Sequence, residues 1–291
     1  MAINRKNNNP FFALCLVLIV LPVLTSLSWY SLIYANLYSA DTEQLVTESS
    51  IKPKFIDKLK EVAEMVTFEY YTGYSDQLEQ HESLQARANN NKADSFRFVR
   101  VFFVVGFLAM IIGQFLLKNH VSVVVILVSM SLLSLLAGLL APTLMIVGLK
   151  TVPVIDEAVV FYQSKGIYST IDSLWSSGNL LVSIMLFLFS VLIPLVKIIV
   201  IGLGLLMNNH FSKRAAHMIH QIGKWSMADV FVVALMLSFF VFDGGSSIEN
   251  TVDTKAELQV GLYFFAGFVL SSMFGTMWVN YVQKREQTSP V

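Results

Sequence analysis

The sequence predicts an all-α integral membrane protein with six transmembrane helices. Of the 291 residues 55% are hydrophobic and only 14% are charged, against about 25% charged in ordinary soluble domains. The charged residues also leave six long gaps, and a helix of about 20 apolar residues crosses the hydrocarbon core of a bilayer. The formal net charge of zero argues against a nucleic-acid binder, which needs a surplus of basic residues.

The first gap predicts an uncleaved membrane anchor, so that residues 1–40 form a cytoplasmic tail and a first helix over 10–38. No charged residue lies between Lys6 and Asp41. This apolar region is longer than the core of a signal peptide, which has about 7–15 residues, and it does not end in an A-x-A cleavage site.

Residues 41–98 predict a small helical segment on the outer, periplasmic side. Hydrophobic residues recur at helical spacing after Pro53 and predict a helix to about residue 71. A break at Gly73 and a second, more polar helix over 76–88 would precede a loop at residues 89–91. Two interpretations remain open, a cap that binds a partner and a tether without a binding role.

The other gaps predict five further spans. The second transmembrane helix is expected within 99–120, and four helices are expected within 121–284, before a cytoplasmic tail at 285–291. Charge-free stretches of these four cover residues 120–149, 230–242 and 258–283, and the stretch 173–206 is interrupted by Lys197 alone. The fifth helix is long enough to span only if it begins near Lys224 and takes Asp229 into the membrane.

The distribution of charges predicts that both termini are cytoplasmic. Sorting the charges by loop puts eight bases and one acid on the side of the termini, and three bases and seven acids in the opposite short loops. Short cytoplasmic loops collect Lys and Arg. The acidic loops should therefore face outwards.

Two ionisable residues are predicted at membrane depth, Lys197 in the fourth helix and Asp229 in the fifth. An unpaired charge there costs at least about 2.5 kcal/mol. At 1.5 Å of rise per residue both side chains fall in the cytoplasmic half of the bundle, level with Thr276 of the sixth helix, and Ser226 lies one turn from Asp229. Thr276 belongs to a polar row with Ser272 and Asn280. The sequence therefore predicts an intramembrane polar cluster of Lys197, Ser226, Asp229 and Thr276.

This cluster has two interpretations. Lys197 and Asp229 either form a static pair that sets the helix register, or form a gate or coupling site whose pairing changes with conformation. Pro194 and Pro142 are predicted to kink the fourth and third helices, because proline removes a backbone hydrogen bond. Small residues at four-residue spacing, among them Gly138 and Gly267, predict close helix packing.

The sequence carries no recognisable enzyme motif, and we predict a protein without catalytic residues, metal or other cofactor. One cysteine, Cys15, excludes a zinc site of several thiolates. A membrane aspartyl dyad needs two Asp residues, and only Asp229 is available. His217 and His220 lack an acidic or thiol partner nearby, and no H-E-x-x-H, G-x-S-x-G or P-loop sequence is present.

The string from Gly223 to Val233, GKWSMADVFVV, resembles the hallmark of the paraquat-inducible protein A family. Further stretches of the chain are similar to that family in the same order: 139–145 (LLAPTLM), 164–169 (SKGIYS), 190–197 (SVLIPLVK) and 261–263 (GLY). The resemblance covers residues 121–284, the length of one membrane domain of that family.

The resemblance implies an inner-membrane protein of a lipid-trafficking system with an MCE-type partner in the periplasm, and it assigns a transport role to Lys197, Ser226, Asp229 and Thr276. Well-studied members often have cytoplasmic zinc ribbons and two tandem membrane domains, which this chain lacks. We therefore expect assistance in the transport of lipids or other hydrophobic molecules. The alternative is a non-transporting scaffold or envelope-stress sensor that uses the periplasmic segment to bind a partner.

Overall fold

The computed structural model describes residues 10–48, 73–115, 120–152, 156–206 and 252–288. Most of these residues are helical, and five of the described helices are long and apolar enough to cross a membrane: Leu14–Glu48, Glu79–Phe115, Ser122–Leu140, Leu180–Val200 and Val260–Trp278. The fifth predicted span, residues 224–242, lies outside the described residues. The count of six spans therefore stays a prediction.

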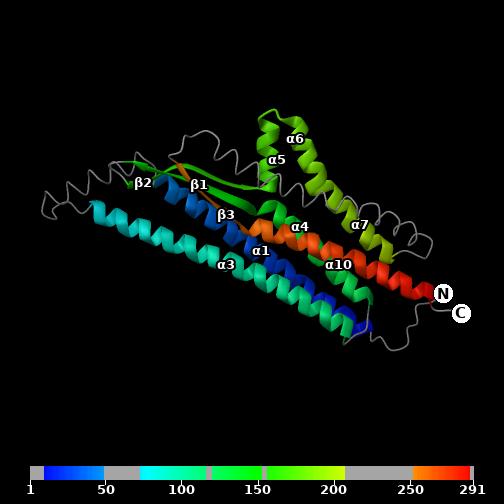
Figure 1. Cartoon of the computed structure of the whole chain (residues 1–291). Helices are drawn as coiled ribbons and strands as arrows, with labels where there is room; N and C mark the ends of the chain where they lie inside the picture. Colours follow the sequence, from blue (N-terminus) through cyan, green and yellow to red (C-terminus); the bar gives the residue numbers. More distant parts are fainter. Residues whose placement is uncertain (1–9, 49–72, 116–119, 153–155, 207–251, 289–291) are drawn as a thin grey trace.

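Two long helices, α1 (Pro10–Glu48) and α3 (Gly73–Phe115), lie side by side along the whole molecule (Figure 1). A helix of about 20 residues already crosses the hydrocarbon core, so both helices continue well beyond it. The predicted first helix, 10–38, was therefore too short. The structure also corrects the loop expected at residues 89–91, because α3 runs through them without interruption and across the predicted boundary at residues 98 and 99.

A side-chain hydrogen bond explains why polar residues continue the helix at that point. Asn91 Nδ2 donates to Asp41 Oδ2 of α1 over 2.7 Å. The run of three asparagines suggested a loop, since Asn has a low helix propensity, but pairing with α1 outweighs that preference. The predicted helix that ends near residue 71 lies outside the described residues.

The prediction of an all-α fold missed a three-stranded antiparallel sheet of order β2-β1-β3. Its strands are β1 (Pro142–Val152), β2 (Asp156–Gly166) and β3 (Val252–Leu258). In the register, Leu144 of β1 lies opposite Lys165 of β2 and Leu258 of β3. The sheet continues from the ends of two packed helices, α4 (His120–Leu140) and α10 (Val260–Thr288).

Pro142 therefore does not kink a helix, as the sequence suggested. It begins β1 directly after α4 ends. A residue before proline avoids the helical region of backbone conformation, so the chain leaves the helix at Ala141. The charge-free run 120–149 divides into a helix and a strand, because apolar content alone does not distinguish them.

Helices α4 and α10 approach each other closely where the sheet begins, as the small-residue spacing predicts for Gly138. A Cβ atom added to Gly138 would lie 2.8 Å from the backbone N of Phe265. A Cβ on Gly261 would lie 2.6 Å from the carbonyl oxygen of Ala141, and a Cβ on Gly166 would meet the same oxygen at 2.6 Å. Glycines from α4, β2 and α10 thus make room for one crowded junction.

The predicted fourth span is built from several pieces: α5 (Ile167–Ser176), α6 (Leu180–Phe187), the π-helix η1 (Leu188–Leu192) and α7 (Ile193–Leu206). A turn with Gly178 at φ 78° separates α5 from α6. Helix α5 leads away from the bundle and α6 returns toward it (Figure 1). The membrane-spanning part is therefore the continuous stretch α6–η1–α7.

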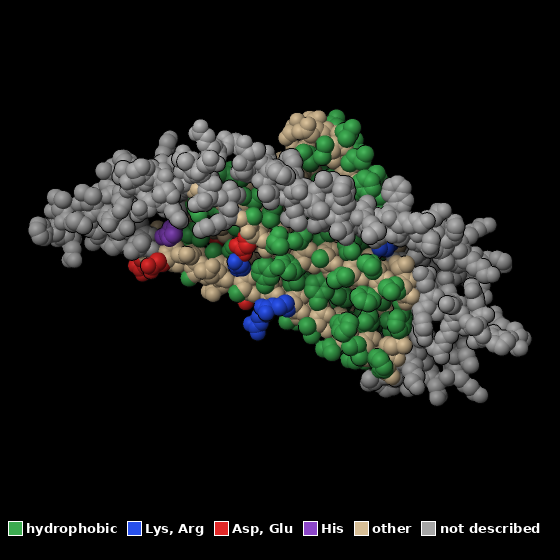
Figure 2. Space-filling view, viewed as in Figure 1, with side chains coloured by type: hydrophobic (Ala, Val, Ile, Leu, Met, Phe, Trp, Pro, Cys, Tyr) green, Lys and Arg blue, Asp and Glu red, His purple; other side chains and the backbone are tan. Residues whose placement is uncertain are grey.

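The ends of the molecule differ in character. The beginning of α1 and the end of α10 lie at one end of the bundle, and the sheet lies toward the other, which we call the sheet end (Figure 1). Figure 2 shows hydrophobic side chains over the middle of the helices and charged side chains gathered toward the sheet end. This distribution is that of a bundle with an apolar belt. Which end faces the cytoplasm stays a prediction.

Candidate functional site

Lys197 is buried in the middle of the bundle, with 3% of its surface exposed. Its Nζ donates a hydrogen bond of 3.0 Å to Ser272 Oγ of α10. Ser272 is itself 1% exposed, and its hydroxyl donates to the carbonyl oxygen of Val269 over 2.9 Å. An ammonium group at this depth is tolerated only where polar atoms replace water, and Ser272 supplies one of them.

Thr276 lies one turn further along α10. Its Oγ1 donates to the carbonyl oxygen of Ser272 over 2.9 Å. Of the predicted polar row on α10, Ser272 faces α7 and accepts the hydrogen bond from Lys197, whereas Thr276 bonds to the backbone of its own helix. The side chain of Asn280, the third member of the row, lies outside the described side chains.

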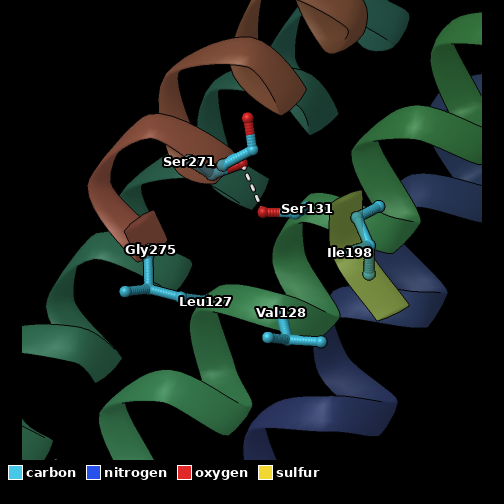
Figure 3. A pocket seen from close by; sticks show the side chains of 7 residues that line it. Leu127, Val128, Ser131, Ile198, Ser271 and Gly275 are labelled. Carbon is cyan, nitrogen blue, oxygen red and sulfur yellow. Dashed lines mark hydrogen bonds between the residues drawn. The ribbon is translucent and has the colours of Figure 1, made fainter. Parts of the chain in front are cut away.

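A second pair of hydroxyl groups lies between α4 and α10. Ser131 Oγ donates to Ser271 Oγ over 2.9 Å, as the dashed line in Figure 3 marks. Both serines are buried, at 3% and 5% exposure. We call Lys197, Ser131, Ser271, Ser272 and Thr276 the Lys197 cluster.

A narrow pocket opens beside the Ser131–Ser271 hydroxyl pair and Ser272 (Figure 3). It has room for about one water molecule. Helices α4, α7 and α10 all contribute to its lining: Leu127, Val128, Ser131, Ile198, Ser271, Ser272 and Gly275. Ser272 lines the pocket and also accepts the hydrogen bond from Lys197, so the lysine lies one hydrogen bond away from the pocket.

The structure brings together two of the four predicted cluster residues, Lys197 and Thr276, through Ser272. The other two, Ser226 and Asp229, lie outside the described residues, so the proposed Lys197–Asp229 pair stays a prediction. The sequence reasoning placed Ser272 in the polar row but not in the cluster, and it did not single out Ser131. Spacing within one helix cannot reveal a partner on another helix.

Pro194 lies one turn before Lys197, directly after the π-helix η1. The backbone N–H of Ile193 donates to the carbonyl of Leu188, five residues earlier. A π-helical turn widens the helix, and Pro194 supplies no N–H to the carbonyl of Ser190. The backbone hydrogen bonds of the helix are therefore irregular around Pro194, as a proline at this position predicts. The predicted kink itself stays a prediction.

At the sheet end, polar contacts hold α1 and α3 against the strands. Lys92 of α3 and Glu257 of β3 form an ion pair of 2.5 Å, and Tyr38 of α1 donates to the same carboxylate over 3.3 Å. Tyr162 of β2 donates to the carbonyl of Ser39 over 3.2 Å, and burial raises the pKa of the Tyr162 phenol, which stays a neutral donor.

Among the described residues, no three His, Cys, Asp or Glu side chains lie close enough together to hold a metal ion. The sites that the described part offers are instead hydroxyl groups and one buried amine. These groups exchange hydrogen bonds with polar molecules and with one another. Together with the apolar belt they define a multi-pass membrane protein with a polar cluster inside its helix bundle.

Comparison with known proteins gives the family of this membrane protein. The sequence profile of the paraquat-inducible protein A family matches residues 132–284, more than half of the chain, and the chain belongs to this family. The matched range lies within the predicted 121–284 unit and contains the whole Lys197 cluster apart from Ser131.

The curated relatives include longer proteins. A Haemophilus influenzae protein named "Probable intermembrane transport protein" is 32% identical over 127 residues, which are 41% of this chain and 30% of the relative. The "Intermembrane transport protein PqiA" of Escherichia coli K12 is 32% identical over 111 residues, 36% of this chain and 25% of the relative. The matched part of this chain thus spans less than a third of either relative. No solved structure matches the chain.

Proposed function

We propose that this chain helps to move lipids or other hydrophobic molecules across the cell envelope from the inner membrane, and that the Lys197 cluster is where it acts. The single observation that carries the proposal is Lys197, buried at 3% exposure inside a family membrane domain. Burying a cation costs at least about 2.5 kcal/mol, and a chain that only anchors itself has no need of it.

The names of the relatives support a transport role, since both are called intermembrane transport proteins. The resemblance noted above adds an MCE-type partner on the periplasmic side and extends the site to Ser226 and Asp229. In this proposal Lys197 exchanges partners as the bundle changes conformation, and the pocket beside Ser272 widens to admit a polar headgroup. The acyl chains stay on the apolar surface of the helices.

The test is photocrosslinking of lipid in cells, with p-benzoylphenylalanine at Val128, which lines the pocket, or at Leu181, which is 72% exposed on α6 and serves as the control. We expect lipid adducts at both positions. In Lys197→Met and Asp229→Ala backgrounds the adducts at Val128 should fall at least tenfold, whereas those at Leu181, which contacts surrounding lipid, should not change.

Two outcomes contradict the proposal. One is an unchanged yield at Val128 in both backgrounds, which leaves the polar residues without a role in lipid binding. The other is full transport by a chain with Lys197→Asp and Asp229→Lys together, since a static pair survives the exchange and a gate that depends on position does not. The first outcome favours the scaffold or sensor interpretation, whereas the second keeps transport and gives the Lys197–Asp229 pair a static role in helix register.

A further inference from the structure

The buried side chains of α6 and η1 are polar, although the stretch is mostly apolar in sequence, whereas α7 also buries the apolar Ile198. Within residues 180–192, all of which are described, the two buried side chains are Ser183 and Ser190, each 1% exposed. Large apolar side chains point outwards instead, with Leu181 at 72% and Ile184 at 55% exposure. Lys197 continues the buried row.

These three residues form a seam. Ser183, Ser190 and Lys197 follow one another at intervals of seven residues, which return to nearly the same side of a helix. All three are buried, at 3% exposure or less, despite the π-helix between Ser183 and Lys197. The seam begins at Ser183, where α5 covers it and the hydroxyl donates to the carbonyl of Ile171 over 3.0 Å, and ends at Lys197, whose partner Ser272 lines the pocket.

Ser190 has no hydrogen-bond partner. Its Oγ is enclosed, and no acceptor or donor lies within reach. Other serines of the bundle do find partners: Ser129 donates to the carbonyl of Val125 on its own helix over 2.8 Å. Ser134 Oγ, one turn along α4 from the pocket residue Ser131, is likewise enclosed and unpartnered. Such groups are rare in proteins and commonly bind water.

The other side of the bundle differs. Ser31 of α1 is 0% exposed and donates to the carbonyl of Ser95 over 3.0 Å. Ser28 of α1 and Ser95 of α3 each donate to a carbonyl of their own helix, at 2.9 Å and 2.7 Å. Buried hydroxyls on that side therefore need no water.

We propose that water molecules occupy the seam between Ser190 and Lys197 and extend to the pocket beside Ser272. Water is the ligand whose size and chemistry suit this place, because the pocket has room for about one molecule and offers the hydroxyls of Ser131, Ser271 and Ser272. This inference does not depend on lipid transport.

The test uses silver ion, a cation of about the size of water that reacts with thiols only where water reaches them. In a Cys15→Ser background, which removes the one native cysteine, the variants Ser190→Cys and Ser31→Cys are compared in membranes. The rate of silver modification is measured as the loss of later maleimide labelling in denaturant. We expect Ser190→Cys to react at least tenfold faster than Ser31→Cys, its equally buried control. Equal rates, or a slower Ser190→Cys, would overturn the proposal.

If Ser190→Cys does not fold, the variant Ser190→Ala tests the same proposal. In Ser190→Ala a hydroxyl that bonds to water is lost, and the Tm should fall by about 2 °C or more, as it should in Ser31→Ala. A dry, unpartnered hydroxyl behaves in the opposite way, because its removal relieves the burial of an unsatisfied group. A Tm of Ser190→Ala that is unchanged or higher would therefore contradict a hydrated seam.

Discussion

On one flank of α4 and α10, helices α1 and α3 fill the interface with aromatic and aliphatic side chains, whereas on the other flank α6, η1 and α7 bury serines and a lysine beside the apolar Ile198. The first, which we call the N-terminal flank, contains Leu24, Phe102 and Phe264, all fully buried, and the rings of Phe102 and Phe264 meet edge to face at 5.4 Å. The second, the α7 flank, contains the Lys197 cluster and the pocket.

The difference shows two ways of associating helices in a membrane. Lipid tails are as apolar as Leu, so helices gain little from hiding apolar side chains and depend on close packing or on polar contacts. The N-terminal flank relies on packing, with Gly267 of α10 leaving space that the ring of Phe103 occupies. The α7 flank relies on hydroxyl and amine groups, which can change partners without leaving a cavity. We expect stability to reside in the first and function in the second.

The largest difference in stability is expected between Gly138→Ala and Gly202→Ala. Gly138 lies at the α4–α10 crossing, against which the N-terminal flank packs, and Gly202 lies on α7. In Gly138→Ala the added Cβ would lie 2.8 Å from a backbone nitrogen that cannot move aside, and the cost should be about 1–3 kcal/mol. In Gly202→Ala the Cβ meets its nearest neighbour, Val128, at an ordinary 3.9 Å, so the change should stay within about 0.5 kcal/mol of zero or stabilise the helix.

Unfolding of the two variants in detergent, followed by tryptophan fluorescence against denaturant, checks this difference. Equal midpoints for Gly138→Ala and Gly202→Ala would show that the crossing is no more tightly packed than the α7 flank, and the comparison would then fail.

A smaller effect is expected from Glu257→Gln, which breaks the ion pair between β3 and α3. The two side chains are 37% and 39% exposed, so water screens the pair and the loss should be about 1 kcal/mol or less. A double-mutant cycle with Lys92→Met isolates the pair energy. A coupling of several kcal/mol would mean that the N-terminal flank is held by this ion pair rather than by packing.

The smallest effect should come from Tyr162→Phe, which removes a long hydrogen bond of 3.2 Å to the carbonyl of Ser39 and should cost about 0.5 kcal/mol, the low end of the usual range. Burial raises the pKa of Tyr162 above its ordinary value of 10.0. The unfolded chain therefore ionises first as the pH rises, and the contribution of the neutral phenol is present below the unfolded pKa and lost above it.

Unfolding midpoints at about pH 8 and pH 11 test the sign of this linkage. The native chain should lose more stability than Tyr162→Phe over that interval. An identical loss in both chains would show that the phenol ionises as easily in the folded protein as in the unfolded one, and that the sheet end is more open than its burial indicates.

Much of this architecture could be predicted from residue patterns along the chain. The gaps between charges located five helices that the structure shows, and the depth of Lys197 in its helix led directly to a buried lysine. The sheet was missed because residues 142–149 continue the apolar run of α4, and a strand and a helix are equally compatible with such a run. The loop predicted at residues 89–91 was wrong for a different reason. Asn prefers loops locally, but here Asn91 hydrogen-bonds to Asp41 of α1 within a continuous helix.

The sequence by itself determined that the chain crosses the membrane several times and that Lys197 lies within one of the spans. Hydropathy and charge are properties of each segment alone, so they can be read without knowing the neighbouring helices. Only the tertiary structure decided that Ser272 receives the lysine, that Ser131 meets Ser271, and that Ser190 faces the bundle without a partner. These facts depend on which helices are neighbours and on how each is rotated. Contacts between segments that are distant in the sequence determine the neighbours and the rotation of each helix, and the residue pattern of one segment does not contain this information.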